Sequence, residues 1–561
     1  MFSLAEGSDI IFNSVLPISP NVGLPPAPKN IKEALAGPDK DLWRQAIELE
    51  LQTLEEYKTF AYADQVGHAM KMKVILTLSY RNDYTLKYKA RLVVCGYSQI
   101  KGIDYEETYS PTTAICTVFM LLHLGAHLKS TIAGFDVTAA FLEGKNDFLQ
   151  YCRLPPELGG MRLLILNSLY GEKQAPKIWY DRIHEILSGM GFARSTSDPC
   201  LYTNTHGVPG DSDYMYMHVT IHIDDGLMIA SSQFIIDNFM SEFNEHIRKI
   251  TLFPTVVKYL GMDISYVDDY VDICQKTYID EKLTCPRLVK TCKIPMSSSE
   301  NLREAVPNEK NPSLLPVTGK LRYLADRTRP DILVATGEIS TGGNVSPSDK
   351  HMVVSRQVVG YIKDTSDLKL RLGGPGALKP FGFTDAQYYT AGESKCRVGG
   401  CIFLNLFSGA MFTYSRLYPN ITHSSMGIEI VGIDYLMRSL IHVMLLLGFL
   451  GYEQTEPCVI YCDNKSAIEL MKTLKSGHKT KHINVLINYI RECINKRMFV
   501  LVFVRTDLNV ADVLTKPLAD KLYHEHVEHL MHGFGGYFDP EREAVYIYEC
   551  VFEPDWEFMD N

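Results

Sequence analysis

The chain has 561 residues, of which 46% are hydrophobic and 22% are charged. This length accommodates three or four domain-sized units, and the composition excludes a wholly disordered protein. The formal net charge is -10, but beyond residue 520 ten acidic residues stand against only Lys521 and Arg542. The rest of the chain is therefore close to neutral and can still carry a local basic groove for nucleic acid.

Cysteine usage and hydropathy predict an intracellular protein without a membrane partner. The 13 cysteines are scattered singly, with no C-x-x-C pair, which favours reduced thiols. The longest apolar run, from Leu440 to Tyr452, is about thirteen residues long and too short to span a bilayer, so it predicts a core helix.

The first part of the chain predicts a linker followed by a helix. Residues 1–30 end in a proline-rich stretch that is typical of a linker. In the helix that follows, apolar residues are interleaved with glutamates, Glu50 among them, and we expect packing rather than chemistry from it. Its apolar positions are Leu42, Ala46, Leu49 and Leu54.

Basic side chains gather between residues 71 and 101. They alternate with apolar residues over 71–78 and 86–94, which predicts two paired strands that share a basic face. Such a face can bind phosphates, and a solvated strand face is an equally compatible reading. The basic residues are Lys71, Lys73, Arg81, Lys87, Lys89, Arg91 and Lys101.

Three carboxylates interrupt or end apolar runs. Asp136 lies within the run from Thr131 to Phe141, and Asp224-Asp225-Gly226 follows a second run. Asp-Gly is a strong turn signal, which predicts that both acids stand at the tip of a buried hairpin. A surface turn that binds nothing is the alternative for this pair alone. Together the three carboxylates suit two-metal phosphoryl transfer with magnesium.

The middle of the chain gives weaker signals. Residues 168–180 predict a glycine turn that enters an amphipathic helix, and residues 259–264 predict a short strand that contains a glycine. Residues 271–375 predict helices that join two domains, with a glycine-rich break at Gly373 to Gly376.

Residues 376–520 predict a compact α/β unit. Strands are expected at 380–383, 399–404, 410–414, 459–462 and 499–504, with helices from 429, from 466 and over 483–494. Four acids fall at ends or starts of these elements. Each alone is typical of an ordinary helix cap, but four in one unit suggest a second metal site. They are Asp385, Glu429, Asp463 and Asp512.

Nine segments carry a resemblance to a known family over about residues 30–520. The first five are Tyr88–Val93, Gly102–Pro111, Phe135–Gly144, Ser168–Tyr180 and the Asp224-Asp225 hairpin. In this order they resemble the reverse transcriptase of copia-type LTR retrotransposon Pol polyproteins. The other four look like that family's connection and ribonuclease H region. They are Thr328–Ile332, Cys462–Ala467, Thr480–Ile483 and Ala511–Leu518.

The resemblance implies an α+β fold of several domains. Fingers and palm of a right-hand polymerase would occupy residues 31–270, a thumb or connection 271–375, a ribonuclease H-like domain 376–520, and an acidic tail 521–561. It implies an RNA-directed DNA polymerase that uses an RNA template, a DNA primer and deoxynucleoside triphosphates. The ribonuclease H domain would cleave RNA in RNA-DNA hybrids, and we expect the protein in cytoplasmic virus-like particles or in the nucleus.

The resemblance also assigns roles by position. Each active site would bind two Mg²⁺ ions, with Mn²⁺ as a possible substitute. The polymerase ligands would be Asp136, Asp224 and Asp225, and the ribonuclease H ligands would be Asp385, Glu429, Asp463 and Asp512. Lys89 and Arg91 would neutralise the incoming triphosphate, Phe141 would exclude a ribose 2′-hydroxyl, and Gln174 lies in the nucleotide-pocket motif. The primer would be positioned by Tyr259, Leu260 and Gly261.

The sequence departs from the family pattern near both sites. His222 stands where Tyr is usual, Glu172 where Leu is usual and Gln387 where Asp is usual, and residues 424–429 keep only the last acid of their motif. No change removes a predicted metal ligand. A relic that binds nucleic acid without turnover is the alternative function, and a nuclease without polymerase activity is a third. Four histidines in the tail predict an exposed helix in preference to a metal site. They are His524, His526, His529 and His532.

Overall fold

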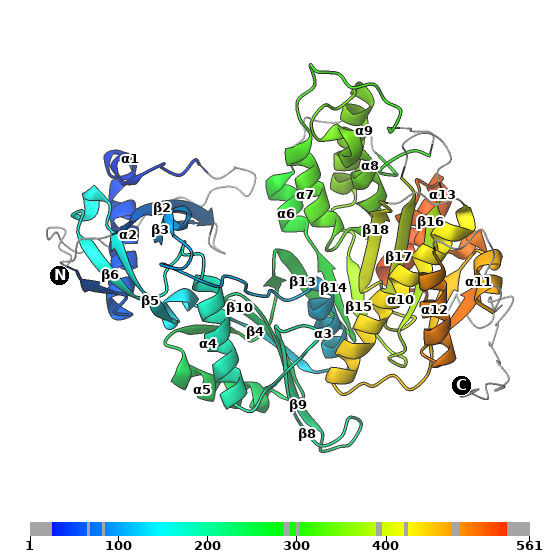
Figure 1. The fold of residues 1–561 in the computed structure, drawn as a ribbon, viewed down its shortest axis with the longest axis horizontal. Helices are drawn as coiled ribbons and strands as arrows, with labels where there is room; N and C mark the ends of the chain where they lie inside the picture. The colour runs from blue at the N-terminus through cyan, green and yellow to red at the C-terminus, as the bar shows by residue number, and fades with distance from the viewer. Residues whose placement is uncertain are drawn as a thin grey trace, which may run out of the picture.

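The structure is a computed structural model that describes residues 25–63, 68–80, 85–283, 292–298, 302–388, 395–419, 424–472 and 483–535. These residues form four sheets with helices packed against them (Figure 1), which confirms the predicted mixture of α and β structure. Several sequence predictions lie outside the described residues. They concern the linker up to residue 24, Arg81, the segment 480–482 and the tail beyond residue 535.

The first sheet has five strands in the order β1-β6-β5-β2-β3. Strands β2 and β3 pair antiparallel, as the alternation of basic and apolar residues predicted. Tyr88 lies on the face of β3 opposite to the basic residues and packs against Trp43 of α2, with ring centroids 4.9 Å apart. The elements are α1 (Ile31–Ala36), α2 (Lys40–Glu56), β1 (Phe60–Tyr62), β2 (Met70–Tyr80), β3 (Leu86–Val94), β5 (Lys145–Arg153) and β6 (Arg162–Asn167).

Helix α2 packs on this sheet through a face that only partly matches the predicted one, because Leu54 is buried and Ala46 packs against the core as expected. Leu49, expected in the core, is 65% exposed, whereas Glu50 is only 7% exposed. The buried apolar residues of the helix are Trp43, Ile47, Leu51 and Leu54. This stripe is shifted by about one residue from the predicted stripe and has the same helical period. A glutamate inside such a face needs polar partners, because burial of an unpaired carboxylate is costly.

The second sheet has six strands in the order β11-β4-β10-β9-β8-β7, all antiparallel to their neighbours. Helices α4 and α5 pack on one face and α3 packs on the other. The elements are α3 (Ile115–His127), β4 (Thr131–Val137), α4 (Ala175–Gly189), β7 (Ala193–Arg194), β8 (Leu201–His206), β9 (Met215–His222), β10 (Asp225–Ala230), α5 (Gln233–His246) and β11 (Ile250–Phe253).

The turn between β9 and β10 lies one to two residues before the predicted Asp-Gly position. His222 pairs with Asp225, so the turn residues are Ile223 and Asp224. Ile223 has a φ of 61°, in the left-handed region that disfavours branched side chains. The indole Nε1 of Trp179 donates a hydrogen bond to the Ile223 carbonyl at 2.6 Å, which stabilises this turn. The acids nevertheless stand at the tip of a hairpin, as predicted.

Gly226 lies inside strand β10 and not in the turn. It is opposite Phe135 of β4, and a Cβ at this position would lie 2.3 Å from the Phe135 ring. The glycine is therefore required by close packing across the sheet rather than by turn geometry.

A four-stranded sheet in the order β12-β13-β14-β15 connects the two halves of the chain. Strand β14 begins at the predicted domain boundary of residue 270 and pairs with β15 about a hundred residues later, so that boundary falls within one sheet. The elements are β12 (Lys258–Tyr259), β13 (Met262–Val267), β14 (Tyr270–Cys274), α6 (Lys276–Lys282), α7 (Leu315–Ala325), α8 (Leu333–Gly343), α9 (Asp349–Asp364) and β15 (Leu370–Gly373).

A buried ion pair links the helices of this connecting region. Arg329 and Asp331 are almost fully buried, with Nη2 and Oδ2 2.8 Å apart. The same guanidinium donates to the Thr365 carbonyl at 3.0 Å, and the Tyr361 hydroxyl donates to Asp331 at 2.8 Å. These bonds join the segment before α8 to the C-terminal end of α9. The Thr328–Ile332 motif is thus structural in this molecule.

The fourth sheet has the order β18-β17-β16-β19-β20. Its first three strands are antiparallel, whereas β16, β19 and β20 are parallel. The predicted strands and helices of this unit are all present. They are β16 (Phe381–Gln387), β17 (Arg397–Phe403), β18 (Phe412–Leu417), α10 (Ser425–Phe449), β19 (Cys458–Cys462), α11 (Lys465–Lys472), α12 (Asn484–Asn495) and β20 (Phe499–Phe503), followed by α13 (Asp520–His532).

Helices α10 and α13 differ from the sequence expectations. The 25-residue α10 includes most of the predicted apolar run and is long and apolar enough to cross a membrane, while 61% of its most apolar window is buried within the protein. It packs against β16 and β17. Helix α13 begins where an acidic tail was expected, and its Tyr523 and Leu530 are buried. His526 is only 2% exposed, so the prediction of exposed histidines is wrong there.

Two glycine substitutions test this packing. We expect Gly226→Ala to destabilise the second sheet by about 1–3 kcal/mol, because the added Cβ overlaps the Phe135 ring. Gly319 in α7 is the matched control, since outside its own helix no atom of the described residues would lie within 4 Å of a Cβ there. Gly319→Ala should raise stability by up to about 1 kcal/mol. Scanning calorimetry measures both, and equal unfolding temperatures for the two variants would contradict the assignment.

Candidate active sites

The first candidate site lies at one end of the second sheet. Asp136 and Asp225 are directly opposite residues of β4 and β10, so their side chains project from the same face with Cβ atoms about 4.5–5.5 Å apart. Asp224 lies beside them in the turn, and its carbonyl accepts a hydrogen bond from the Val137 amide at 2.9 Å. The backbone itself therefore brings the three predicted carboxylates together.

These carboxylates oppose one another's ionisation. Burial, followed by the charges of Asp224 and Asp136, raises the pKa of Asp225 to about 6. Burial, followed by the charge of Asp224, also raises the pKa of Asp136. A divalent cation with a preference for oxygen ligands would relieve this repulsion. The residues present therefore fit the predicted magnesium.

The basic face of β3 is directed toward the same carboxylates. The charges of Lys89 and Arg91 lower the pKa of Asp136. Burial lowers the pKa of Lys89, and the charges of Asp136 and Asp224 partly offset this effect. Cations from the first sheet and anions from the second sheet thus lie close enough to interact, although more than forty residues separate them in the sequence.

Arg91 is fixed by contacts on two sides. Its Nη1 lies 3.5 Å from Oε2 of Glu50, and its guanidinium lies over the Tyr170 ring, 4.6 Å from the centroid. Tyr170 in turn makes an edge contact with Phe141, with centroids 5.2 Å apart. Arg91, predicted to bind the triphosphate, and Phe141, predicted to exclude the 2′-hydroxyl, therefore share one aromatic neighbour. Sequence reasoning assigned no role to this tyrosine.

Gln174 and Glu172 are buried behind this surface. Gln174 is 3% exposed and accepts a hydrogen bond from Gln99 Nε2 at 2.8 Å, so its side chain lies in the interior. Glu172 accepts from the Leu169 amide at 2.7 Å and from Asn146 Nδ2 at 3.2 Å. Burial raises the pKa of Glu172 to about 7 despite these bonds.

Tyr259 ends strand β12, and Leu260 and Gly261 form the hairpin turn to β13. Leu260 and Gly261 have φ values of 47° and 76°, as a two-residue type I′ turn requires. The Tyr259 hydroxyl donates to the Asp225 carbonyl at 3.5 Å, and the Tyr323 hydroxyl of α7 donates to the Leu260 carbonyl at 3.1 Å. The predicted primer-positioning residues therefore lie beside the carboxylates.

The second candidate site lies at the carboxyl ends of the parallel strands β16 and β19 in the fourth sheet. Asp385 is in β16, Asp463 follows the neighbouring parallel strand β19, and Asp512 is in a 3₁₀ segment at Val510–Leu514. One oxygen from each lies within 4.8 Å of the other two. In the part of the chain that the structure describes, two sets of ligand atoms meet this distance, and both lie in this unit. The three carboxylates of the first site do not meet it together.

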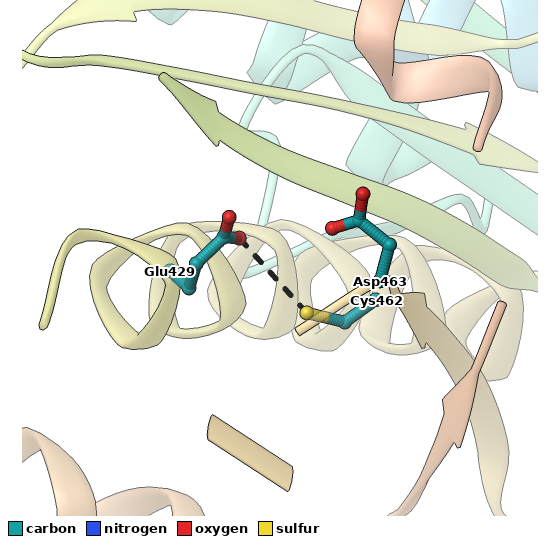
Figure 2. Close-up of side chains that lie close together, drawn as sticks. All are labelled: Glu429, Cys462 and Asp463. Atoms are coloured by element: carbon teal, nitrogen blue, oxygen red, sulfur yellow. Dashed lines mark hydrogen bonds between the residues drawn. The ribbon is translucent and has the colours of Figure 1, made fainter. Parts of the chain in front are cut away.

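Glu429 completes the site from the first turns of α10 (Figure 2). Its carboxylate, the Cys462 thiol and Asp463 form the other close set. The thiol donates to Glu429 Oε2 at 3.9 Å, and burial, followed by the charge of Glu429, raises the pKa of Cys462. The thiol therefore remains protonated and supports Glu429 rather than offering a thiolate ligand. Sequence reasoning missed this contact, for which the only signal was the position of Cys462 directly before Asp463.

Lys516 lies between two acids of this site. Its Nζ is 3.0 Å from Asp512 Oδ1 and 3.7 Å from Asp385 Oδ2. Burial, followed by the charge of Asp385, raises the pKa of Asp512 to about 8, and the ammonium group opposes this shift. The Thr515 hydroxyl donates a further hydrogen bond to Asp385. The spacing of Asp512 and Lys516 is that of a helical ion pair, which was the available sequence signal.

Comparison with known proteins identifies the class of the first site. Residues 62–298, which contain its three carboxylates and β3, match the family described as reverse transcriptase (RNA-dependent DNA polymerase). The matches to whole proteins agree with this class. They confirm the resemblance to the copia-type retrotransposon Pol polyproteins that was found in the sequence.

Two of these relatives are plant proteins. The Retrovirus-related Pol polyprotein from transposon TNT 1-94 of Nicotiana tabacum is 29% identical over 510 residues, which cover 87% of this chain and 38% of that protein. The corresponding polyprotein from transposon RE1 of Arabidopsis thaliana is 27% identical over 459 residues, 79% of this chain and 30% of that protein. The chain thus spans about a third of the length of these curated relatives.

A solved structure of the foamy viral protease-reverse transcriptase dRH in complex with double-stranded DNA also aligns with the chain. The alignment has a TM-score of 0.47 and 10% identity, and it covers 83% of this chain and 70% of that one.

Glu172 should make stability depend on pH. Its pKa is about 7 in the folded state and about 4.3 in the unfolded state. The wild-type chain therefore loses stability as pH rises from about 4.3 to 7, by roughly 4 kcal/mol in total. Glu172→Gln should remove this loss, and the variant should be the more stable protein at pH 8. Thermal unfolding at pH 5 and pH 8 measures this, with exposed Glu106→Gln as control. A parallel pH dependence in all three proteins would refute it.

Lys516 should stabilise the protein in the absence of divalent cations. We expect Lys516→Met to destabilise the chain by roughly 1–3 kcal/mol in a chelating buffer, because Asp385 and Asp512 lose the cation between them. Added Mg²⁺ should restore most of the loss. Lys521→Met is the control, since that side chain is 90% exposed. Thermal unfolding with and without Mg²⁺ tests this, and equal shifts for the two variants would count against it.

Proposed function

We propose that the chain is an RNA-directed DNA polymerase with an associated ribonuclease H-like nuclease. The observation that carries the first activity is the pairing of Asp136 with Asp225, with Asp224 beside them, inside the segment that matches the reverse transcriptase family. In this proposal the first sheet acts as the fingers and the second sheet as the palm. The third sheet and helices α6 to α9 act as thumb and connection.

The polymerase step assigns separate tasks to the two sheets. Bound at Asp136, Asp224 and Asp225, two magnesium ions would supply activation of the primer 3′-hydroxyl and charge stabilisation during phosphoryl transfer. Lys89 and Arg91 are assigned to the triphosphate, since they are cations whose charges act on Asp136 of the same site. Phe141, backed by Tyr170, limits the space at the ribose 2′ position. The turn from Tyr259 to Gly261 positions the primer end.

The nuclease step is assigned to the fourth sheet. Four acids converge there, three of them with oxygens within 4.8 Å of one another, and hard carboxylate oxygens suit two magnesium ions. Such a site would cleave the RNA strand of an RNA-DNA hybrid. The thiol of Cys462 remains outside the ligand set and supports Glu429. Both activities act on nucleic acid. We therefore place the protein inside the cell, in a cytoplasmic particle or in the nucleus.

A second candidate function is nucleic-acid binding without turnover. The observation that favours it is His222, which is paired with Asp225 where the family usually has tyrosine. Its Nδ1 is buried and has no hydrogen-bond partner among the described residues. An unsatisfied polar atom next to the carboxylates marks a site that is incompletely adapted to this side chain.

Two assays in one reaction tube separate these functions. On an RNA template with Mg²⁺, we expect the wild-type chain to extend a DNA primer and to cleave the hybrid RNA. Asp225→Asn should lower extension by at least about 100-fold and leave cleavage intact, whereas Asp463→Asn should do the reverse. Extension that survives Asp225→Asn would refute the polymerase assignment. Hybrid binding without either activity would establish the second candidate.

A further inference from the structure

We propose that Glu50 of α2 is a positioning residue that orients Arg91 for the triphosphate. The inference rests on the proposed polymerase function and deepens it. It assigns α2, for which the sequence predicted only packing, to the nucleotide-binding machinery of the first sheet.

Glu50 uses both of its carboxylate oxygens. Oε1 accepts a hydrogen bond from the Leu92 amide at 2.9 Å, and Oε2 lies 3.5 Å from Nη1 of Arg91. Strand β3 is at the edge of its sheet, where alternate amides face away from the ladder and need partners from outside it. The Leu92 amide finds such a partner in Glu50. One carboxylate therefore closes the sheet edge and also contacts the side chain of the preceding residue.

The burial of Glu50 makes this contact specific. The residue is 7% exposed, and burial raises its pKa, whereas the Leu92 amide and then the charge of Arg91 lower it. A buried carboxylate without a cation is costly, so Glu50 has a strong preference for a guanidinium at this position. If this position only packed against the sheet, leucine would stabilise the helix better than Glu50 does.

Tyr170 fixes the other side of the guanidinium. The Arg91 guanidinium lies 4.6 Å from the Tyr170 ring centroid, and the Tyr170 carbonyl accepts from the Val94 amide at 2.8 Å. The backbone of Tyr170 is thereby tied to β3, the strand that carries Arg91. Between a carboxylate and a ring face, a long side chain loses most of its rotamers during folding.

This arrangement lowers the cost of binding a triphosphate. Arg91 remains 29% exposed, and its charge partly offsets the rise in the pKa of Asp136 that burial and the charge of Asp224 cause. Because the side chain is ordered before the nucleotide arrives, its ordering entropy is not lost at the binding step. Without Glu50 the arginine would have to be ordered by the nucleotide itself, and the affinity for nucleotide would fall.

Glu50→Gln tests the role with little change in shape. Glutamine keeps an oxygen that can accept from Leu92 and loses the charge that holds Arg91. We expect KM for the deoxynucleotide to rise about 3- to 10-fold, kcat to stay within about twofold, and the unfolding temperature to change little. Glu48→Gln, on the exposed side of the same helix, should leave KM unchanged. The assay is single-nucleotide primer extension by the full chain on an RNA template.

A second variant and a double-mutant cycle make the test robust to misfolding. Glu50→Asp keeps the charge but shortens the side chain, so KM should rise with it as well. In an Arg91→Lys background, Glu50→Gln should have much less effect on KM, because the contact is already broken. If wild-type protein extends primers and both Glu50 variants retain its KM, the positioning role is overturned and the polymerase function stands. A wild-type chain that never extends primers overturns the proposed function, and the role of Glu50 with it.

Discussion

Like charges that the backbone holds close together are the constraint on which both candidate sites depend. In the second sheet, antiparallel pairing places Asp136 directly opposite Asp225. In the fourth sheet, β16 and β19 are parallel neighbours, so Asp385 and Asp463 come together at the carboxyl ends of these strands. The carboxylates cannot move apart while these ladders persist. Burial together with their repulsion raises the pKa values of Asp225 and Asp512, and cations from metal ions or from the chain itself offset the repulsion.

The two sites differ in where the chain's own cation comes from. In the fourth sheet it is local, because Lys516 follows Asp512 by one helical turn and contacts it at 3.0 Å. In the second sheet it comes from the edge strand of another sheet, through Lys89 and Arg91. A local cation such as Lys516 offsets the repulsion between the carboxylates however the sheets are arranged relative to one another. A remote cation does so only while the two sheets face each other, and a ligand that binds both would stabilise that arrangement.

The parts of the fold predicted from sequence are those that local periodicity encodes. Alternation predicted β2, β3 and strands of the fourth sheet. All seven carboxylates proposed for the two sites were singled out because they interrupt apolar runs or stand at the ends or starts of predicted elements. The predicted buried face of α2 was partly wrong because two apolar stripes on the helix share one helical period. Burial of Glu50 depends on its hydrogen bond with the Leu92 amide on another element, which local periodicity does not encode. The turn was misplaced because Asp-Gly is a local signal, whereas Gly226 is required by Phe135 on another strand. Roles for Tyr170 and Cys462 also depend on contacts between distant segments, whereas Lys516 had a local signal in its spacing from Asp512.

The departures from the family pattern surround the carboxylates without changing their charge. Glu172 replaces a usual leucine, yet two hydrogen bonds satisfy it and its raised pKa favours the neutral form below about pH 7. At His222, burial and then the charge of Arg327 lower the pKa of the imidazole, so the ring is neutral at physiological pH, as tyrosine would be. A neutral ring does not compete with a metal ion for Asp224 or Asp225. The substitution therefore alters shape and hydrogen bonding beside the site, where primer and template would lie, rather than the ability of the carboxylates to bind metal.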